Sequence, residues 1–271
     1  MKYTGNIRKM KGVNNEQVNY FLRLYDVLEP AHEIALNQLI GQQIKLTFEN
    51  EIHCVVTGKK IKKPYGEGMS YDAFISSPLA VESILRPELS RIHEGIALRD
   101  EAWELEHHLK PHFVYLSLTS GLKVGVTRTT QVPTRWIDQG ATEAIVLAET
   151  PYRQAAGLIE VSLKQYLADK TNWQAMLKGD VSGIINLIAE KQRVLSLLPE
   201  ELVAFAHKDD TVTRLNYPVL VYPQKITNLK FEKTPVIQGK LAGIKGQYLL
   251  FADGSVLNVR SHTAYKISLE F

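Results

Sequence analysis

Cysteine is nearly absent from this chain, because Cys54 is the single one among 271 residues. A lone cysteine forms no internal disulfide and cannot supply a multi-cysteine zinc site. No apolar run reaches the roughly 18 residues that a membrane-spanning helix needs. The polar, basic stretch 1–12 has no apolar segment of the kind found in a signal peptide. These absences predict a cytoplasmic protein with no membrane partner.

A strong excess of charge is also lacking, since 32 basic residues face 29 acidic ones and the net charge is +3. A basic surface that binds nucleic acid would therefore have to be local. The loop 58–68 is one candidate, because it carries Lys59, Lys60, Lys62 and Lys63. Such a charge run is most often a solvated face. The functional alternative is a set of contacts to phosphate.

The apolar pattern predicts an α+β protein in three consecutive parts. Residues 1–111 form a helical and hairpin region, 112–212 a sheet-and-helix module with a helical extension, and 213–271 a small β-sheet or barrel. Hydrophobic residues make up 45% of the chain, which is enough for a sizeable core.

The first part is expected to begin with helices. Helical spacing of apolar residues predicts one helix over 14–28 and another over 34–40. Alternation predicts a hairpin of strands 43–48 and 52–57.

His107, His108 and His112 follow in a segment without a clear period. Surface histidines are the ordinary interpretation of such a group, and a metal site is the alternative.

The middle part has a clearer order of strand, strand, helix, strand and long helix, over 113–118, 122–127, 133–139, 143–148 and 151–169. Further helical patterns cover 173–176 and 181–198. The last part is predicted to hold an edge strand over 217–223 and three short strands within 239–270. Its turns are expected at Gly246–Gln247 and Asp253–Gly254.

Polar residues recur at intervals along the middle part. Tyr115 falls on its first strand and Lys123 on its second, Arg135 on the following helix and Glu160 on the long helix. Gly125 leaves room for a close approach of backbone or ligand. Thr127 and Arg128 are candidate contacts to phosphate.

This ordered set resembles the GIY-YIG nuclease superfamily. Phe113-Val114-Tyr115 and Lys123-Val124-Gly125 stand where that superfamily has its two named tripeptides. The resemblance implies that Tyr115 contacts or deprotonates the attacking water and that Arg135 holds the phosphoryl oxygens. It implies that Glu160 binds one Mg²⁺ or Mn²⁺, with Lys123 in place of a second tyrosine.

The chain also departs from that pattern. The superfamily's histidine after the arginine helix is replaced by Gln139, which cannot take up a proton well, and its first glycine by Phe113. Ordinary roles therefore stay open: a strand aromatic for Tyr115, an ion pair for Arg135 and a solvated helix position for Glu160.

More than one role is also open for some neighbouring residues. Trp136 and Trp173 are expected in the core rather than as platforms for stacking bases. Arg153 and Lys164 are either solvated charges or part of a phosphate path.

Longer strings resemble domain-of-unknown-function family 2797. They are Gly-Leu-Lys-Val-Gly-Val-Thr-Arg (121–128), Pro-Thr-Arg-Trp-Ile-Asp-Gln-Gly-Ala (133–141) and Asp-Lys-Thr-Asn-Trp (169–173). That family commonly has cysteine pairs that suggest structural zinc. Here Thr57 stands where the second cysteine of the knuckle around Cys54 is expected, and 83–99 contains none. The resemblance therefore implies a branch without zinc.

Three functions follow from the sequence. The first is a divalent-metal-dependent nucleic-acid hydrolase, and the second is a nucleic-acid-binding protein, for DNA or RNA, that keeps the fold without catalysis. The third is a protein–protein scaffold. Whether the chain is an enzyme and whether it forms oligomers are both left open.

Overall fold

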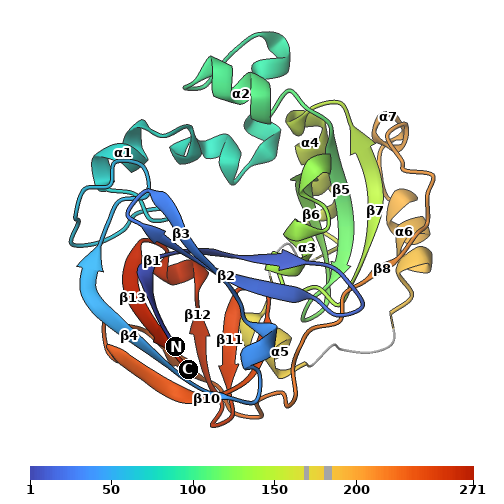
Figure 1. The fold of residues 1–271 in the computed structure, drawn as a ribbon. Coiled ribbons are helices and arrows are strands. Elements are labelled where there is room, and N and C mark those ends of the chain that lie inside the picture. The colour runs from blue at the N-terminus through green and yellow to red at the C-terminus, as the bar shows by residue number, and fades with distance from the viewer. Residues whose placement is uncertain (168–170, 180–184) are drawn as a thin grey trace. The chain divides into compact units, whose positions relative to one another are not determined.

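The computed structural model describes residues 1–167, 171–179 and 185–271. It is an α+β protein whose elements divide into two compact units (Figure 1). Unit 1 comprises Met1–Ser77, Leu177–Gly179 and Asn216–Phe271, and unit 2 comprises Pro78–Met176 and Asp180–Leu215. The first and last of the three expected parts both contribute residues to unit 1.

Unit 1 is built on a nine-stranded sheet with the order β3-β2-β1-β13-β4-β10-β11-β12-β9. Its strands are β1 (Lys2–Val13), β2 (Asn19–Asp26), β3 (Glu29–Ala35), β4 (Gln43–Ile52), β9 (Thr227–Leu229), β10 (Val236–Lys245), β11 (Tyr248–Phe251), β12 (Ser255–Asn258) and β13 (Tyr265–Glu270). Strand β13 pairs antiparallel with both β1 and β4. The C-terminal strands therefore extend a sheet that they share with the N-terminal strands.

The helix predicted over 14–28 is wrong, because this stretch contains strand β2. Tyr20, Leu22 and Leu24 are at most 1% exposed and alternate with half-buried residues. The apolar spacing here is compatible with both periods, and pairing with β1 and β3 selects the strand.

Three further expectations in unit 1 are corrected. Strand β3 and a 3-10 turn at Asn37–Leu39 replace the helix expected over 34–40. Strand β4 runs without a break past the expected hairpin turn. The segment 217–223 forms a bridge between Val219 and Gly243 rather than a strand, since its two prolines lack N–H donors. The turns at Gly246–Gln247 and Asp253–Gly254 are confirmed.

Unit 2 follows the predicted order closely. Its sheet has the order β6-β5-β7-β8, formed by β5 (His112–Leu118), β6 (Leu122–Arg128), β7 (Glu143–Thr150) and β8 (Thr213–Arg214). The helices are α2 (Glu101–His107), α3 (Thr134–Asp138), α4 (Arg153–Leu163), α6 (Leu187–Leu195) and α7 (Glu200–Val203); α1 (Tyr71–Ser76) belongs to unit 1, and α5 is Trp173–Lys178. The expected end of the long helix near Asp169 lies outside the described residues, and so does the start of the helix expected over 181–198.

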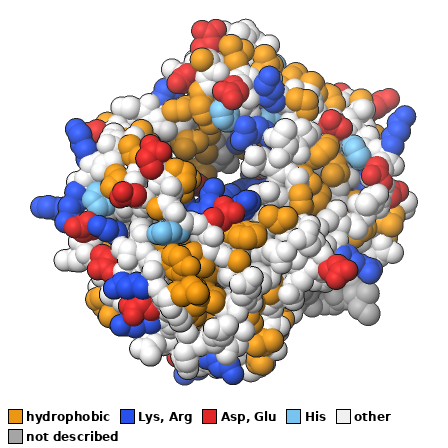
Figure 2. Space-filling model, in the orientation of Figure 1, with side chains coloured by type: hydrophobic (Ala, Val, Ile, Leu, Met, Phe, Trp, Pro, Cys, Tyr) orange, Lys and Arg blue, Asp and Glu red, His pale blue; other side chains and the backbone are white. Residues whose placement is uncertain are grey.

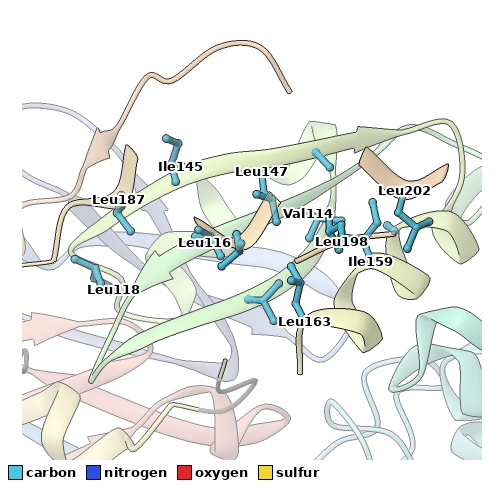
Figure 3. Close-up of a cluster of buried hydrophobic side chains, with 14 residues drawn as sticks. Val114, Leu116, Leu118, Ile145, Leu147, Ile159, Leu163, Leu187, Leu198 and Leu202 are labelled. Carbon is cyan, nitrogen blue, oxygen red and sulfur yellow. The ribbon is translucent and has the colours of Figure 1, made fainter. Parts of the chain in front are cut away.

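The core of unit 2 joins the sheet to its helices. Side chains from β5, β6 and β7 pack with those of α4 and of the α6–α7 segment in one buried cluster (Figure 3). Val114, Leu116 and Ile159 are all fully buried in it. Burying a side chain of this size contributes roughly 1.5–3 kcal/mol. The cluster fixes α4 against the strands, so the polar residues of both elements have defined positions.

Candidate functional site

The pairing of β5 with β6 gathers the candidate residues on one face of the sheet. Tyr115 lies opposite Gly125, Ser117 opposite Lys123, and Phe113 opposite Thr127. Directly opposed residues and residues two apart share a face. Tyr115, Lys123 and Thr127 therefore project from the same side of unit 2, as their intervals in the sequence suggested.

Gly125 makes room for the Tyr115 ring. A Cβ atom added at Gly125 would lie 2.6 Å from Tyr115 Oη and 2.8 Å from its Cζ. Contacts this short are not tolerated, so a residue with a side chain at 125 would displace the ring. The glycine thus allows the tyrosine to lie across the neighbouring strand.

The Tyr115 phenol is fully buried and hydrogen-bonded. Its hydroxyl donates to Gln139 Oε1 at 2.9 Å, just after α3. The Trp136 ring, 3% exposed, packs edge-on against it at 5.9 Å, which agrees with a core role for this tryptophan. Burial raises the pKa of Tyr115, against the lowering effect of the Arg135 charge. The phenol therefore holds its proton at neutral pH.

Arg135 and Glu160 both act on this phenol. The negative charge of Glu160 raises the pKa of Tyr115, whereas the positive charge of Arg135 lowers it. Glu160 lies on α4 with a side chain only 12% exposed, and its Oε2 is 3.4 Å from Lys164 Nζ, one helical turn away. Two of the residues expected to form the catalytic set, Arg135 and Glu160, thus act electrostatically on a third, Tyr115.

Arg153 is a central residue of this region, although the sequence left it as a solvated charge or part of a phosphate path. Its guanidinium donates to the carbonyl oxygens of Ser83 at 3.1 Å and Ile84 at 2.9 Å. Burial lowers the pKa of Arg153 to about 10; the charge of Glu160 opposes this shift, and the charges of Arg135 and Arg128 add to it. Arg128 and Arg135 are therefore both close enough to Arg153 for their charges to act on it.

His108 and His112 are buried, which corrects the expectation that they lie at the surface, whereas His107 is half-buried. His108 is 2% exposed and His112 is fully buried. Burial and then the charge of Arg153 lower the pKa of His108 to about 3. Burial likewise lowers the pKa of His112 to about 4, and the Arg153 and Arg128 charges contribute in the same direction. Both imidazoles are neutral at pH 7 and add no positive charge to the site.

The arrangement does not suit a divalent cation as it stands. Mg²⁺ and Mn²⁺ favour carboxylate oxygens, and Glu160 is the carboxylate that the resemblance assigns to the ion. Its charge is already matched by the Lys164 ammonium and by the nearby guanidinium of Arg153. Within 1–167, 171–179 and 185–271, no three His, Cys, Asp or Glu side chains gather as metal ligands. We derive no chemical step through a metal ion.

The lysine loop belongs to unit 1 and is exposed at Lys59, Lys60, Lys62 and Lys63. Lys60 Nζ is 3.4 Å from Glu51 Oε1, so its charge is partly compensated. Lys63 Nζ lies 5.6 Å from the centre of the Tyr65 ring. Lys59 and Lys62 extend the positive charge of the loop.

Cys54 sits in a tight knuckle of unit 1. Its sulfur accepts the backbone N–H groups of Thr57 at 3.4 Å and Ser70 at 3.2 Å. Burial raises the pKa of this thiol, but hydrogen bonds from Thr57, Ser70 and Val56 outweigh it and lower the pKa to about 6. The turn is thus held by N–H···S bonds around one cysteine. The absence of zinc stays a prediction from the sequence.

The model of the family DUF2797, described as protein of unknown function, matches residues 41–267. The chain belongs to the DUF2797 family. The match spans most of both units, including the site around Tyr115. No curated protein and no solved structure matches the chain. In the described part of this DUF2797 member, no helix is long and apolar enough to cross a membrane.

Sequence reasoning missed the contribution of the segment 78–94, which holds four 3-10 turns. A Cβ atom at Gly157 of α4 would lie 2.2 Å from the backbone nitrogen of Glu88. Together with the two carbonyl groups held by Arg153, this contact fixes the segment against α4 beside the site. Pro78 and Pro87 in this segment were the signal for turns; the sequence contains no signal for the docking of the segment against α4.

Proposed function

We propose that this DUF2797 protein binds nucleic acid through the phosphodiester backbone, at the site of unit 2 around Arg128, Arg135 and Arg153. The observation that carries the proposal is that the charges of Arg128 and Arg135 both act on the guanidinium of Arg153. Guanidinium groups match phosphate oxygens in geometry and charge.

Like charges so close together repel each other, and an anion between them removes the repulsion. The carboxylates that act on Arg153 are Glu160 and Glu88. Glu88 Oε1 is bound by Arg86 at 3.1 Å, and Glu160 is paired with Lys164. Each of these two carboxylates therefore has a further cation beside it, although Arg86 is shared with Glu82 at 2.7 Å.

The rest of the surface supports a local interface. On the face drawn in Figure 2, basic and acidic side chains are interspersed in small groups instead of being segregated. With a net charge of only +3, affinity would come from a few phosphate contacts. The exposed lysines of the 58–68 loop offer additional contacts of this kind.

Binding without hydrolysis is favoured by the state of Tyr115. A general base must lose its proton near the working pH. Burial raises the pKa of this phenol, and its proton is held in the bond to Gln139. Gln139 is an amide and takes over no proton from the phenol.

Metal-dependent hydrolysis is the second candidate. The electrostatic effect of Arg135 and Glu160 on Tyr115 favours this candidate. These three residues match the roles that the GIY-YIG resemblance implies. Hydrolysis would require Glu160 to leave its ion pair with Lys164 and bind a divalent metal ion when substrate binds.

The test is binding of labelled DNA and RNA, single- and double-stranded, between 50 and 200 mM salt. We expect Arg135→Gln to weaken binding about tenfold, or roughly 1.4 kcal/mol, and to lower the salt slope by about one contact. Arg214→Gln is the matched control, because Arg214 is a 79% exposed side chain of the same unit that pairs with Glu143. Equal affinity of both variants and the parent would overturn the proposal.

The same samples separate the two candidates. Incubation with Mg²⁺ or Mn²⁺ should leave the nucleic acid intact if the site only binds. Cleavage that disappears in Glu160→Gln, with binding retained, would establish hydrolysis instead. Absence of binding at low salt would favour the protein–protein scaffold.

A further inference from the structure

A cavity of unit 1 lies where the pairing of β10 with β11 is irregular. The register of these strands shifts between Leu241 and Gly243, so Ala242 is the extra residue of a β-bulge. A second segment crosses β10 at this point, because Leu220 N donates to Ala242 O at 2.9 Å. The bulge and the crossing segment border a cavity of about 200 Å³.

The walls of this cavity are mostly apolar. Leu220, Val221 and Phe251 line it with large side chains, whereas Ala242 and Ala252 line it with small ones that leave it unfilled. Leu220 is 64% exposed and Val221 is 70% exposed, so two large apolar side chains stay in contact with solvent here. Ligand sites are mostly apolar hollows with a few polar groups that orient the ligand. The apolar part of such a site is therefore present.

Lys240 of β10 supplies the polar part. It is exposed, and it is the one ionisable residue among the described residues that line the cavity. No carboxylate of the described chain pairs with its ammonium. Asp253 follows the lining residue Ala252, but its Oδ1 accepts hydrogen bonds from Ser255 N at 2.9 Å and Ser255 Oγ at 2.6 Å, and it lies outside the lining. The cavity thus combines apolar walls with one positive charge that has no counter-ion there.

We propose that this cavity binds a small carboxylate with an apolar body, whose carboxylate pairs with Lys240 Nζ. The apolar body lies against Leu220, Val221 and Phe251. An apolar cavity of about 150 Å³ holds a benzene ring, so a cavity of about 200 Å³ has room for a ring with a short acid side chain. A carboxylate fits better than a phosphate, because the other described lining side chains offer no hydrogen-bond donor for further oxygens. The site shares no residue with the site around Arg153.

The test is an NMR titration of the full chain, isotope-labelled at the Leu and Val methyl groups, with phenylacetate. Phenylacetamide and phenethylamine are the matched compounds, because they keep the apolar body and replace the negative charge by none or by a positive one. We expect phenylacetate to bind with a dissociation constant of about 1 mM and to shift the methyl signals of Leu220 and Val221. Phenylacetamide should bind about fivefold more weakly, since it lacks the ion pair, and phenethylamine at least about tenfold more weakly.

Exposed variants locate the binding without disturbing the core. Lys240→Gln should weaken phenylacetate about fivefold and leave phenylacetamide unchanged. Lys225→Gln is the control, because Lys225 is an exposed lysine of the same unit outside the lining, and it should change neither affinity. Val221→Ser should weaken both compounds alike, because it removes an apolar contact, and it assigns the Val221 methyl signals.

Three results would overturn the proposal. The first is no binding of phenylacetate at about 20 mM, and the second is an equal affinity for the three compounds. The third is unchanged phenylacetate binding in Lys240→Gln, which would place the carboxylate elsewhere.

Discussion

The hydroxyl of Tyr115 donates to Gln139 Oε1 at 2.9 Å, and this bond joins β5 to the end of α3 beneath the site. Because an amide oxygen has no proton to give, Tyr115 is the donor. The positive charge of Arg135 lowers the pKa of the same phenol. Burial keeps the tyrosine protonated against the effect of this charge, which suits positioning better than proton abstraction.

Gly125 and Tyr115 should be coupled in stability. Gly125→Ala places a methyl group 2.6 Å from Tyr115 Oη, so we expect a loss of about 1–3 kcal/mol from overpacking. Tyr115→Phe alone should cost about 1 kcal/mol through its lost hydrogen bond. In the double variant the oxygen is gone, and only Cζ stays near the methyl group. The loss of stability in the double variant should therefore be smaller than the sum of the two single losses. Urea denaturation of the four proteins measures this, and strict additivity would contradict it.

Acid should destabilise the protein partly through His112. The folded pKa is lowered to about 4 from an ordinary 6.5, so the unfolded chain binds a proton that the folded chain excludes between these values. Stability is therefore unaffected above pH 6.5 and falls as pH decreases toward 4, by roughly 3 kcal/mol at most.

The check is the urea midpoint between pH 7 and 4 in His112→Asn, whose amide can still donate to the Lys110 carbonyl as Nδ1 does at 2.7 Å. This variant should have a shallower pH dependence than the parent protein. His32→Asn, at an exposed position of β3, should keep the parent slope. Equal slopes in all three proteins would exclude a contribution from His112.

The lysine loop should contribute to binding in proportion to its free charge. Replacing Lys59, Lys62 and Lys63 with alanine should lower the log–log salt slope by up to about 0.9 per lost phosphate contact on duplex. Lys60→Ala should have a smaller effect, because Lys60 already pairs with Glu51 at 3.4 Å. Thermal unfolding should be nearly unchanged in both variants, since exposed pairs contribute little. An unchanged slope in the triple variant would restrict binding to unit 2.

The sequence predicted unit 2 well because its elements are short, local and bounded by turn signals. Pro133 and Gly140 bracket α3, and the β5–β6 hairpin closes over Ser120–Gly121. The order Tyr115, Arg135, Glu160 was also visible, since each residue falls on a separate predicted element.

Unit 1 was predicted poorly, because its sheet depends on pairings distant in sequence. Strand β2 has apolar residues that fit a helix, and only its neighbours β1 and β3 decide the period. The insertion of β13 between β1 and β4 joins residues more than 200 positions apart. Burial of His112 and Lys245 was equally invisible, because it depends on what the folded chain places around them.

Replacing Lys245 should stabilise the protein. Lys245→Met keeps the length of the side chain and removes a buried amine that has no hydrogen-bonding partner among the described residues. The folded pKa of about 8 lies below the ordinary 10.5, so the unfolded chain binds an extra proton between these values. The stability of the parent protein therefore falls as pH decreases from 10.5 to 8 and is constant below that range.

At pH 7 we expect Lys245→Met to be more stable by about 1–3 kcal/mol. Lys240→Met, exposed on the same strand, should change little. Chemical denaturation at pH 7 and pH 10 measures both effects, and the gain should shrink at pH 10. A loss of stability in Lys245→Met would mean that the contacts of the ammonium with Tyr217 and Tyr222 outweigh its burial.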